Sequence, residues 1–328
     1  MLFSASMAEA QSSKSGTIRL TAGSTTSSSG AYIWAVAIVR AINKYAPGIN
    51  VTLVESGATY DNLRRIREGV FDLGLADGWH GPLELYRGLE TFEGKGWKEI
   101  RILFFRDPSP CRTYVRADSG IKMWSDLKGK RLHAGQPGSA AAQRVMRANE
   151  LLGTGAVIVP GALGDAANQL QIGRVDAVHK SGPADTFDAL LLEAHLMTPL
   201  SVIGFSDEEA AKISVRYPQF LVAKTAAGSI KPVPKLGSLW EIVTLGVSST
   251  SSRLPQDVGY RMTKAVYEHW KEIGQAFPAC ASYDPIMDYV RIVPKGNEVP
   301  IQAGVIQYAK ERGIKIPASL IPPEYKEK

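Results

Sequence analysis

Apolar residues along this chain alternate between the spacing of strands and the spacing of helices. Residues 17–22 place Ile18 and Leu20 on one side, as a strand does. Residues 31–45 carry apolar side chains three and four positions apart, which is the spacing of one helix face, and residues 49–54 form a second β-branched run. The order strand, helix, strand predicts a parallel βαβ unit with a right-handed crossover.

The same periodicities predict further elements along the chain. Strands are expected at residues 72–76, 100–105, 112–115, 130–134, 156–159, 177–179. Helices are expected at residues 139–152, 165–172, 255–277, 304–312. This alternation of strands and helices is typical of an α/β fold with parallel or mixed sheets.

One sequence pattern occurs twice in the chain. In each copy, a Gly/Ser-rich loop precedes a helix. Further along the chain, a second helix ends at a Gly, an Asp follows three positions later, and a strand follows the Asp. The loop is GSTTSSSG from Gly23 in the first copy and GQPGS from Gly135 in the second, and the stops are GVFD from Gly69 and GRVD from Gly173. The repeat predicts two lobes that face each other across a cleft, each presenting unpaired helix N-terminal amides. Such an arrangement favours a binding protein over a catalyst.

The chain must return from the second lobe to the first, so strands are expected to cross between them. The expected crossings lie near residues 112–116 and 240–247, which would form a hinge. This predicts a first lobe of residues 16–113 plus 248–328 and a second lobe of residues 114–247.

Composition agrees with two ordinary globular lobes. A length of 328 residues allows two separate cores, and 45% hydrophobic with 21% charged residues is usual for a folded domain. Basic residues exceed acidic ones by 38 − 32 = 6, but they are scattered rather than clustered, which argues against a nucleic-acid partner. A net positive charge would help to attract small anions.

The N-terminus carries the expected remains of an export signal. SMA at residues 6–8 and AEA at residues 8–10 have the small-x-small pattern of a signal-peptidase site. We therefore expect residues 1–15 to be a residual signal and a disordered lead, and the protein to be periplasmic. No apolar run reaches the roughly 20 residues that a membrane-spanning helix needs.

The sequence contains no recognisable catalytic or metal motif. It has no Gly-x-Ser-x-Gly elbow, Walker loop, Gly-x-Gly-x-x-Gly turn or His-Glu-x-x-His pair, and its five histidines have no ligand spacing. Cys111 and Cys280 lie far apart and are compatible with one disulfide, although we expect two buried thiols. We therefore predict a protein without catalytic residues, metal or cofactor.

The hydroxyl-rich loop is the strongest candidate for ligand contact. A turn with one N-cap would account for a single serine. Residues 24–29 carry further hydroxyls at the carboxyl edge of the first strand, directly before a helix N-terminus where amides favour anions. The turns at residues 56–59 and 136–139 are expected to meet it in the same cleft.

Three other side chains are candidates with open roles. Asp77 and Trp79 follow a strand at the same edge, and they are either pocket residues or a surface acid and a half-buried tryptophan. Arg112 lies within an apolar strand, where a cation requires a carboxylate. That carboxylate is expected to belong to Asp77 or to the ligand.

Four motifs together resemble one protein family. They are GSTTSSSGAY from Gly23, ESGATYDNLRRIREGVFDLGLAD from Glu55, VRADSGIKMWSDLKGKRLHAGQPGS from Val115 and IGRVDAVHKSGPAD from Ile172. They are similar to the TAXI family, the extracytoplasmic solute receptors of tripartite ATP-independent (TRAP) transporters, over roughly residues 16–316. The resemblance implies a bilobal type II periplasmic-binding-protein fold that closes on a small solute. It also implies delivery of the solute to a membrane permease driven by an ion gradient.

The resemblance also implies a set of ligand contacts in the three loops. Together with the candidates above, the predicted ligand-binding residues are Ser24, Thr25, Ser29, Tyr32, Ser56, Gly57, Ala58, Asp77, Trp79, Arg112, Pro137, Ser139 and Ser181. Family members commonly bind glutamate or glutamine, and this chain differs from them in its longer hydroxyl-rich first loop and at Asp77, Arg112 and Gln302. The prediction is therefore a monomeric receptor for a small organic acid or amino acid.

Two other classes of protein share the expected fold. One is an enzyme that acts on a small carboxylated metabolite in the same cleft. The other is a ligand-sensing partner of a membrane regulator. A receptor binds its ligand without turnover, whereas an enzyme consumes it.

Overall fold

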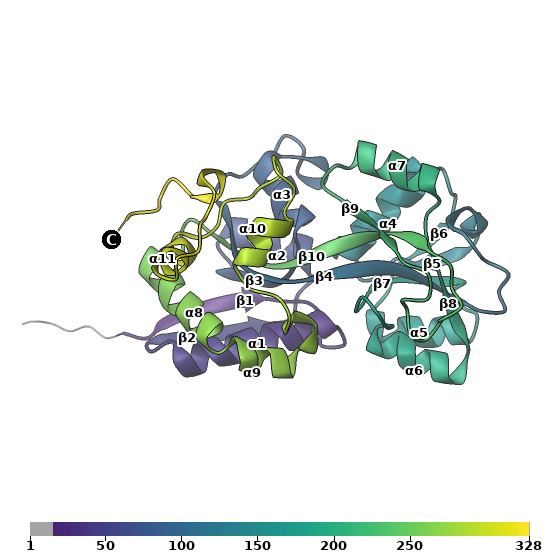
Figure 1. Cartoon of the computed structure of the whole chain (residues 1–328), viewed down its shortest axis with the longest axis horizontal. Coiled ribbons are helices and arrows are strands. Elements are labelled where there is room, and N and C mark those ends of the chain that lie inside the picture. Colours follow the sequence, from purple (N-terminus) through teal and green to yellow (C-terminus); the bar gives the residue numbers. More distant parts are fainter. Residues whose placement is uncertain (1–15, 328) are drawn as a thin grey trace, which may run out of the picture.

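Two α/β lobes lie side by side in the computed structural model, joined by two long strands (Figure 1). The structure describes residues 16–327, so the predicted residual export signal at residues 1–15 lies outside it. Every helix among the described residues is too short or too polar to cross a membrane.

The first lobe is built on the predicted βαβ unit. Its opening elements are β1 (Ile18–Gly23), α1 (Gly30–Tyr45), β2 (Ile49–Val54), α2 (Thr59–Glu68), β3 (Leu73–Gly78) and α3 (His80–Arg87). β1 pairs in parallel with β2 and with β3. Trp34, Ile38 and Ile42 are buried on one face of α1, which confirms the helical stripe predicted from their spacing.

The second lobe repeats this plan. Its elements are β5 (Arg131–His133), α4 (Ala140–Leu151), β6 (Val157–Val159), α5 (Leu163–Gln171), β7 (Ala177–Ser181), α6 (Ala189–Met197), β8 (Leu200–Ile203), α7 (Asp207–Arg216) and β9 (Leu221–Thr225). β5 pairs in parallel with β6 and β7. The chain then returns through β10 (Leu239–Ser251), α8 (Gln256–Glu268), α9 (Trp270–Ala276), α10 (Met287–Ile292) and α11 (Ala303–Glu311).

The duplicated sequence pattern forms the same hydrogen bonds in both lobes. The Asp72 carboxylate accepts from the Thr21 amide at 2.7 Å, and the Asp176 carboxylate accepts from the Arg131 amide at 2.8 Å. The helix stops are also alike, because Gly69 and Gly173 both have the left-handed backbone that favours glycine (φ 79° and 71°). The repeat seen in the sequence is therefore a structural repeat.

The strands β4 (Ile100–Arg116) and β10 run antiparallel through both lobes and merge their sheets into one, in the order β2-β1-β3-β10-β4-β7-β5-β6. Two separate strands were predicted at residues 100–105 and 112–115. That prediction is wrong, because Pro108 and Ser109 between them stay paired with Leu245 and Thr244 of β10.

Apolar side chains form separate cores on the two sides of these crossing strands. One cluster draws on residues 20–105 and 245–320. Two others draw on residues 114–242, one including Trp124 and Val145 and the other including Tyr114 and Leu191. The described residues thus form separate cores in the two lobes, and β4 and β10 contribute buried side chains to cores on both sides.

Two local predictions need correction. The helix expected at residues 255–277 breaks at His269 into α8 and α9, and Trp270 then packs edge-on against Trp34 with ring centroids 5.5 Å apart. The strand expected to end at residue 76 is longer, because β3 continues to Gly78, so Asp77 lies within this strand and α3 begins at His80. Both cysteines are free and buried, as expected.

Candidate functional site

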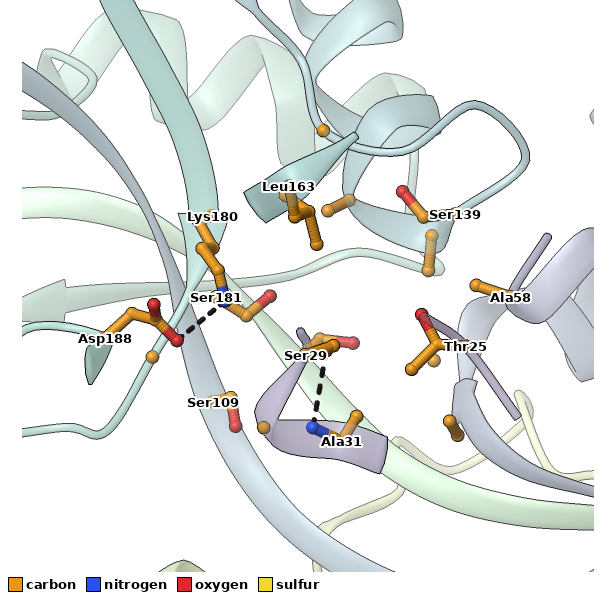
Figure 2. A pocket seen from close by; sticks show the side chains of 18 of the residues that line it. Thr25, Ser29, Ala31, Ala58, Ser109, Ser139, Leu163, Lys180, Ser181 and Asp188 are labelled. Carbon is orange, nitrogen blue, oxygen red and sulfur yellow. Dashed lines mark hydrogen bonds and ion pairs between the residues drawn. The ribbon is translucent and has the colours of Figure 1, made fainter. Parts of the chain in front are cut away.

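A cavity of about 260 Å³ lies between the lobes, at the carboxyl ends of their parallel strands (Figure 2). Residues of both lobes line it. Its polar lining residues are Thr25, Ser29, Thr59, Asp77, Arg106, Asp107, Ser109, Gln136, Ser139, Arg144, His179, Lys180, Ser181, Asp188 and Thr244. Ligands of open α/β folds bind at this edge, because helix N-termini converge there.

Five helix N-termini reach the cavity. First-turn or capping residues of α1, α2, α4, α5 and α6 are among its lining. Ser29 accepts a hydrogen bond from the Ala31 amide at 3.4 Å, and Ser139 accepts from the Ala142 amide at 3.1 Å. α1 and α4 have no acidic side chain in their first turn, so their positive ends are not neutralised locally. This end of the cavity favours an anion.

Arg144 of α4 is a buried cation in the cavity wall. Its side chain donates to Thr244 Oγ1 at 3.1 Å and to Cys111 Sγ at 2.9 Å, and it contacts His80 Nδ1 at 3.3 Å. Its Nε has no hydrogen-bond partner, and no carboxylate among residues 16–327 forms an ion pair with it. A buried cation without a counter-charge is costly, so Arg144 strongly favours an incoming anion.

The other two cations of the cavity already have partners. Arg106 pairs with Asp107, its neighbour on β4. Lys180 of β7 pairs with Asp188, the N-cap of α6, with 2.7 Å between Nζ and Oδ2 (Figure 2). Of the three cavity cations, Arg144 alone lacks a carboxylate partner within the part of the chain that the structure describes.

Two buried histidines beside Arg144 remain uncharged. Burial and the nearby guanidinium lower the pKa of His179 to about 3, and burial together with Arg144 and Arg147 holds the pKa of His80 well below its usual value. Both rings are therefore neutral at physiological pH, and the positive charge of this wall comes from Arg144.

Asp77 lines the cavity and supports the loops that surround it. Its Oδ1 accepts from Asn62 Nδ2 at 2.9 Å, and Asn62 in turn binds the Ser24 carbonyl at 2.9 Å and the Ser56 hydroxyl at 2.6 Å. Its Oδ2 faces Gly74, where an added Cβ would come within 2.5 Å of it. Burial raises the pKa of Asp77 to about 6. We infer that Asp77 acts by positioning the first two loops.

The three predicted loops meet across the cleft. Thr25 Oγ1 donates to Gln136 Oε1 at 3.2 Å, and Gln136 Nε2 donates to the Ser56 carbonyl at 2.9 Å. The Tyr60 amide donates to the Gly138 carbonyl at 3.1 Å. Gly138 has φ 82°, and a Cβ there would lie 3.0 Å from the Gly57 carbonyl oxygen, so this close approach of the lobes requires glycine.

The structure places the predicted contact residues in three groups. Those that line the cavity are Thr25, Ser29, Ala58, Asp77, Ser139 and Ser181. Those in or next to the loops but outside the lining are Ser24, Tyr32, Ser56, Gly57 and Pro137. Those buried away from the cavity are Trp79 and Arg112.

Trp79 and Arg112 have structural environments that differ from the expected ones. Trp79 is 2% exposed and packs in the first-lobe core. Arg112 Nε pairs with Glu241 Oε1 at 3.0 Å, and its other nitrogens donate to carbonyls of residues 183–186. The expected partners, Asp77 or a ligand, are thus replaced by Glu241 of β10. Alternation along β4 turns Arg112 away from Cys111, which contacts Arg144.

Sequence reasoning missed Arg144. A signal was present, because Arg144 shares the buried face of its helix with Ala140 and Ala148 at spacings of four. A cation on an apolar face needs an explanation. The spacing alone, however, does not show that Thr244 of β10 and His80 of the other lobe lie opposite it.

Comparison with known proteins agrees with this architecture. Residues 20–313 match the NMT1-like family. A putative L-cystine ABC transporter structure from Listeria monocytogenes is 14% identical with a TM-score of 0.51, and the match covers 81% of this chain and 97% of that one. A Xanthomonas citri protein bound to ATP is 12% identical with a TM-score of 0.53, covering 89% and 98%. The periplasmic binding protein BugD is 9% identical with a TM-score of 0.53, covering 83% and 88%. These matches confirm the bilobal fold.

Proposed function

The chain belongs to the NMT1-like family, and on that premise we propose that it is an extracytoplasmic receptor that binds a small anionic solute between its lobes. The fold it shares with periplasmic binding proteins supports this role. The four motifs that resemble the TAXI family further support delivery of the solute to the permease of a TRAP transporter. The receptor is proposed to act as a monomer.

The proposal depends mainly on the environment of Arg144. It lies 1% exposed in the wall of an interlobe cavity, beside helix N-termini, and has no carboxylate partner among the described residues. A carboxylate of the solute would supply the missing counter-charge and accept charge-assisted hydrogen bonds. Because the cavity is lined from both lobes, the same solute would also hold the lobes together.

The environment of the two buried histidines beside Arg144 favours a receptor over an enzyme. A general base works best when its pKa lies near the operating pH. The pKa of His179 is lowered to about 3 and that of His80 lies well below its usual value, which makes both rings poor proton acceptors at neutral pH.

Calorimetry with a panel of mono- and dicarboxylates, oxo acids and amino acids tests the proposal. We expect one class to bind stoichiometrically without being consumed, as followed by NMR of the ligand. Arg144→Met should weaken that binding at least a hundredfold. Arg131→Met, which removes the exposed cation of the Arg131–Asp176 pair in the same lobe, is the matched control and should leave the affinity unchanged. Equal affinities for wild type and Arg144→Met would refute the proposed anion site.

Transport assays distinguish the proposed transporter class. In vesicles that contain the cognate permease, uptake with the purified receptor should require an ion gradient and continue without ATP. Uptake that depends on ATP would instead assign the receptor to an ABC transporter.

A further inference from the structure

The carboxylates around the cavity are already engaged. Asp107 accepts from Arg106 Nε and from the Ser109 hydroxyl. Asp188 accepts from Lys180 Nζ at 2.7 Å and from the Leu190 amide at 3.0 Å. Each of these two acids therefore has both a cation and a second donor, and neither offers a free negative charge to a ligand.

Asp77, the third acid, lines the cavity but is only 1% exposed. Its Oδ1 accepts a hydrogen bond from Asn62. Its Oδ2 is buried beside Gly74, with no hydrogen-bond partner among the described residues and no surface open to a ligand. Among the described residues that line the cavity, no carboxylate is thus placed to receive a ligand ammonium group.

The electrostatics of the site oppose a second positive charge. Arg144 is an uncompensated cation, and the positive ends of α1 and α4 add to its field. His179 and His80 respond to this environment, since burial and Arg144 keep both in the neutral form. A ligand ammonium group would enter the same field without a partner, and an unpaired charge in a desolvated site is costly.

The rest of the lining suits an uncharged body. Its apolar members are mostly alanines, with Leu163 and Phe277 as the larger side chains. Hydroxyls of Thr25, Ser29, Ser109, Ser139 and Ser181 are interspersed (Figure 2). A hydroxyl can donate or accept, so these groups suit a ligand oxo or hydroxy oxygen.

We propose that the solute is a small monocarboxylic acid without an ammonium group, such as a 2-oxo or 2-hydroxy acid. Its single carboxylate binds Arg144, its oxo or hydroxy oxygen contacts the hydroxyls, and its carbon chain lies against the alanine-lined wall. This inference rests on the proposed receptor function and narrows its ligand, because one free cation matches one negative charge.

Matched ligand sets test the inference with the full chain in isothermal titration calorimetry. Each set keeps one carbon skeleton and varies the group at carbon 2: pyruvate, lactate and alanine; 4-methyl-2-oxopentanoate, 2-hydroxy-4-methylpentanoate and leucine; phenylpyruvate, phenyllactate and phenylalanine. In at least one set, the oxo or hydroxy acid should bind at least tenfold more tightly than the amino acid. An amino acid that binds as tightly as its oxo and hydroxy analogues, or the absence of binding in all three sets, would overturn the inference.

Further binding measurements distinguish a wrong ligand class from a wrong receptor function. If an amino acid or a dicarboxylate binds and Arg144→Met abolishes its binding, the function stands and only the ligand class is wrong. If no carboxylate of the wider panel binds, the function fails as well.

A charge variant gives an independent test of the same inference. Lys180→Met removes the cation from Asp188 and leaves a free carboxylate at the cavity. The ratio of amino-acid to oxo-acid affinity should then rise at least tenfold. Lys231→Met, which breaks the exposed Lys231–Asp185 pair in the same lobe, is the control and should leave the ratio unchanged. An unchanged ratio in a folded Lys180→Met variant would contradict the proposed role of charge.

Discussion

Glu84 of α3 and Arg147 of α4 form a buried ion pair between the two lobes. Arg147 nitrogens lie 2.5 and 3.1 Å from the two carboxylate oxygens, and the Tyr60 hydroxyl donates to Glu84 Oε2 at 2.8 Å. One helical turn away on the same two helices, His80 contacts Arg144 at 3.3 Å. Arg144, which we propose binds the carboxylate of the solute, is therefore adjacent to the ion pair that joins the two lobes on this side of the cleft.

This arrangement predicts that Glu84 affects solute affinity without touching the solute. Glu84→Gln leaves Arg147 with only the more distant carboxylate of Glu90, 3.9 Å from its Nε, in the closed state, whereas water can solvate Arg147 when the lobes open. The open form should become more populated, with a larger radius of gyration in small-angle X-ray scattering and about ten- to a hundredfold weaker binding, because the fraction of competent protein falls.

The pair Arg131–Asp176 provides the control for that experiment. It joins two segments of the second lobe, so Asp176→Asn should alter stability but not the radius of gyration or the affinity. If Glu84→Gln bound the solute as tightly as wild type, the ion pair would have no role in closure.

The buried Asp77 should make stability depend on pH. Its pKa is raised from 3.8 to about 6 in the folded protein, so the folded state binds its proton more tightly than the unfolded state does. The contribution of Asp77 to the free energy of unfolding is greatest below pH 4 and is lost as the pH rises through 6. The loss is on the order of 3 kcal/mol at pH 7. Urea unfolding of wild type and Asp77→Asn between pH 4 and 7 should show this slope in the wild type and its absence in the variant. Parallel curves would show that Asp77 is solvated.

Replacing Ala58 with glycine should stabilise the protein. It precedes α2 with φ 67° and ψ −153°, a conformation that is nearly exclusive to glycine. Ala58→Gly should therefore raise the free energy of unfolding by about 1 kcal/mol. Ala211→Gly on the exposed face of α7 is the matched control and should lower it by about 0.5–1 kcal/mol. A similar loss in both variants would show that Ala58 is not strained.

Arg112 should contribute to stability through Glu241. Both side chains are almost fully buried, so Arg112→Met leaves an unpaired carboxylate and should lower the free energy of unfolding by about 3–5 kcal/mol. The double variant Arg112→Met/Glu241→Met should recover much of that loss, because it removes the stranded charge. Additive losses in denaturant unfolding would mean that the two residues are not coupled.

Local patterns in the sequence predicted the βαβ unit of the first lobe, its counterpart in the second lobe and the loops that open toward the cleft, but not α3 or the elements from α6 to β9. Helical stripes, Gly stops and N-cap serines involve residues a few positions apart, so Ser29 before α1 and Ser139 before α4 were predictable. The duplicated pattern also indicated two lobes and the sheet edge at which their loops meet. The motifs further identified the type of bilobal fold.

Only the tertiary structure decided which charges meet. Glu84 and Arg147 are 63 positions apart, and Arg112 and Glu241 are 129 positions apart. Such pairs depend on how β4 and β10 join the sheets and on how α4 of one lobe approaches α3 of the other, and no local spacing encodes either. The same reason explains why Arg144 looked like an ordinary helical residue. Its lack of a counter-charge becomes visible only when every neighbour from both lobes is in place.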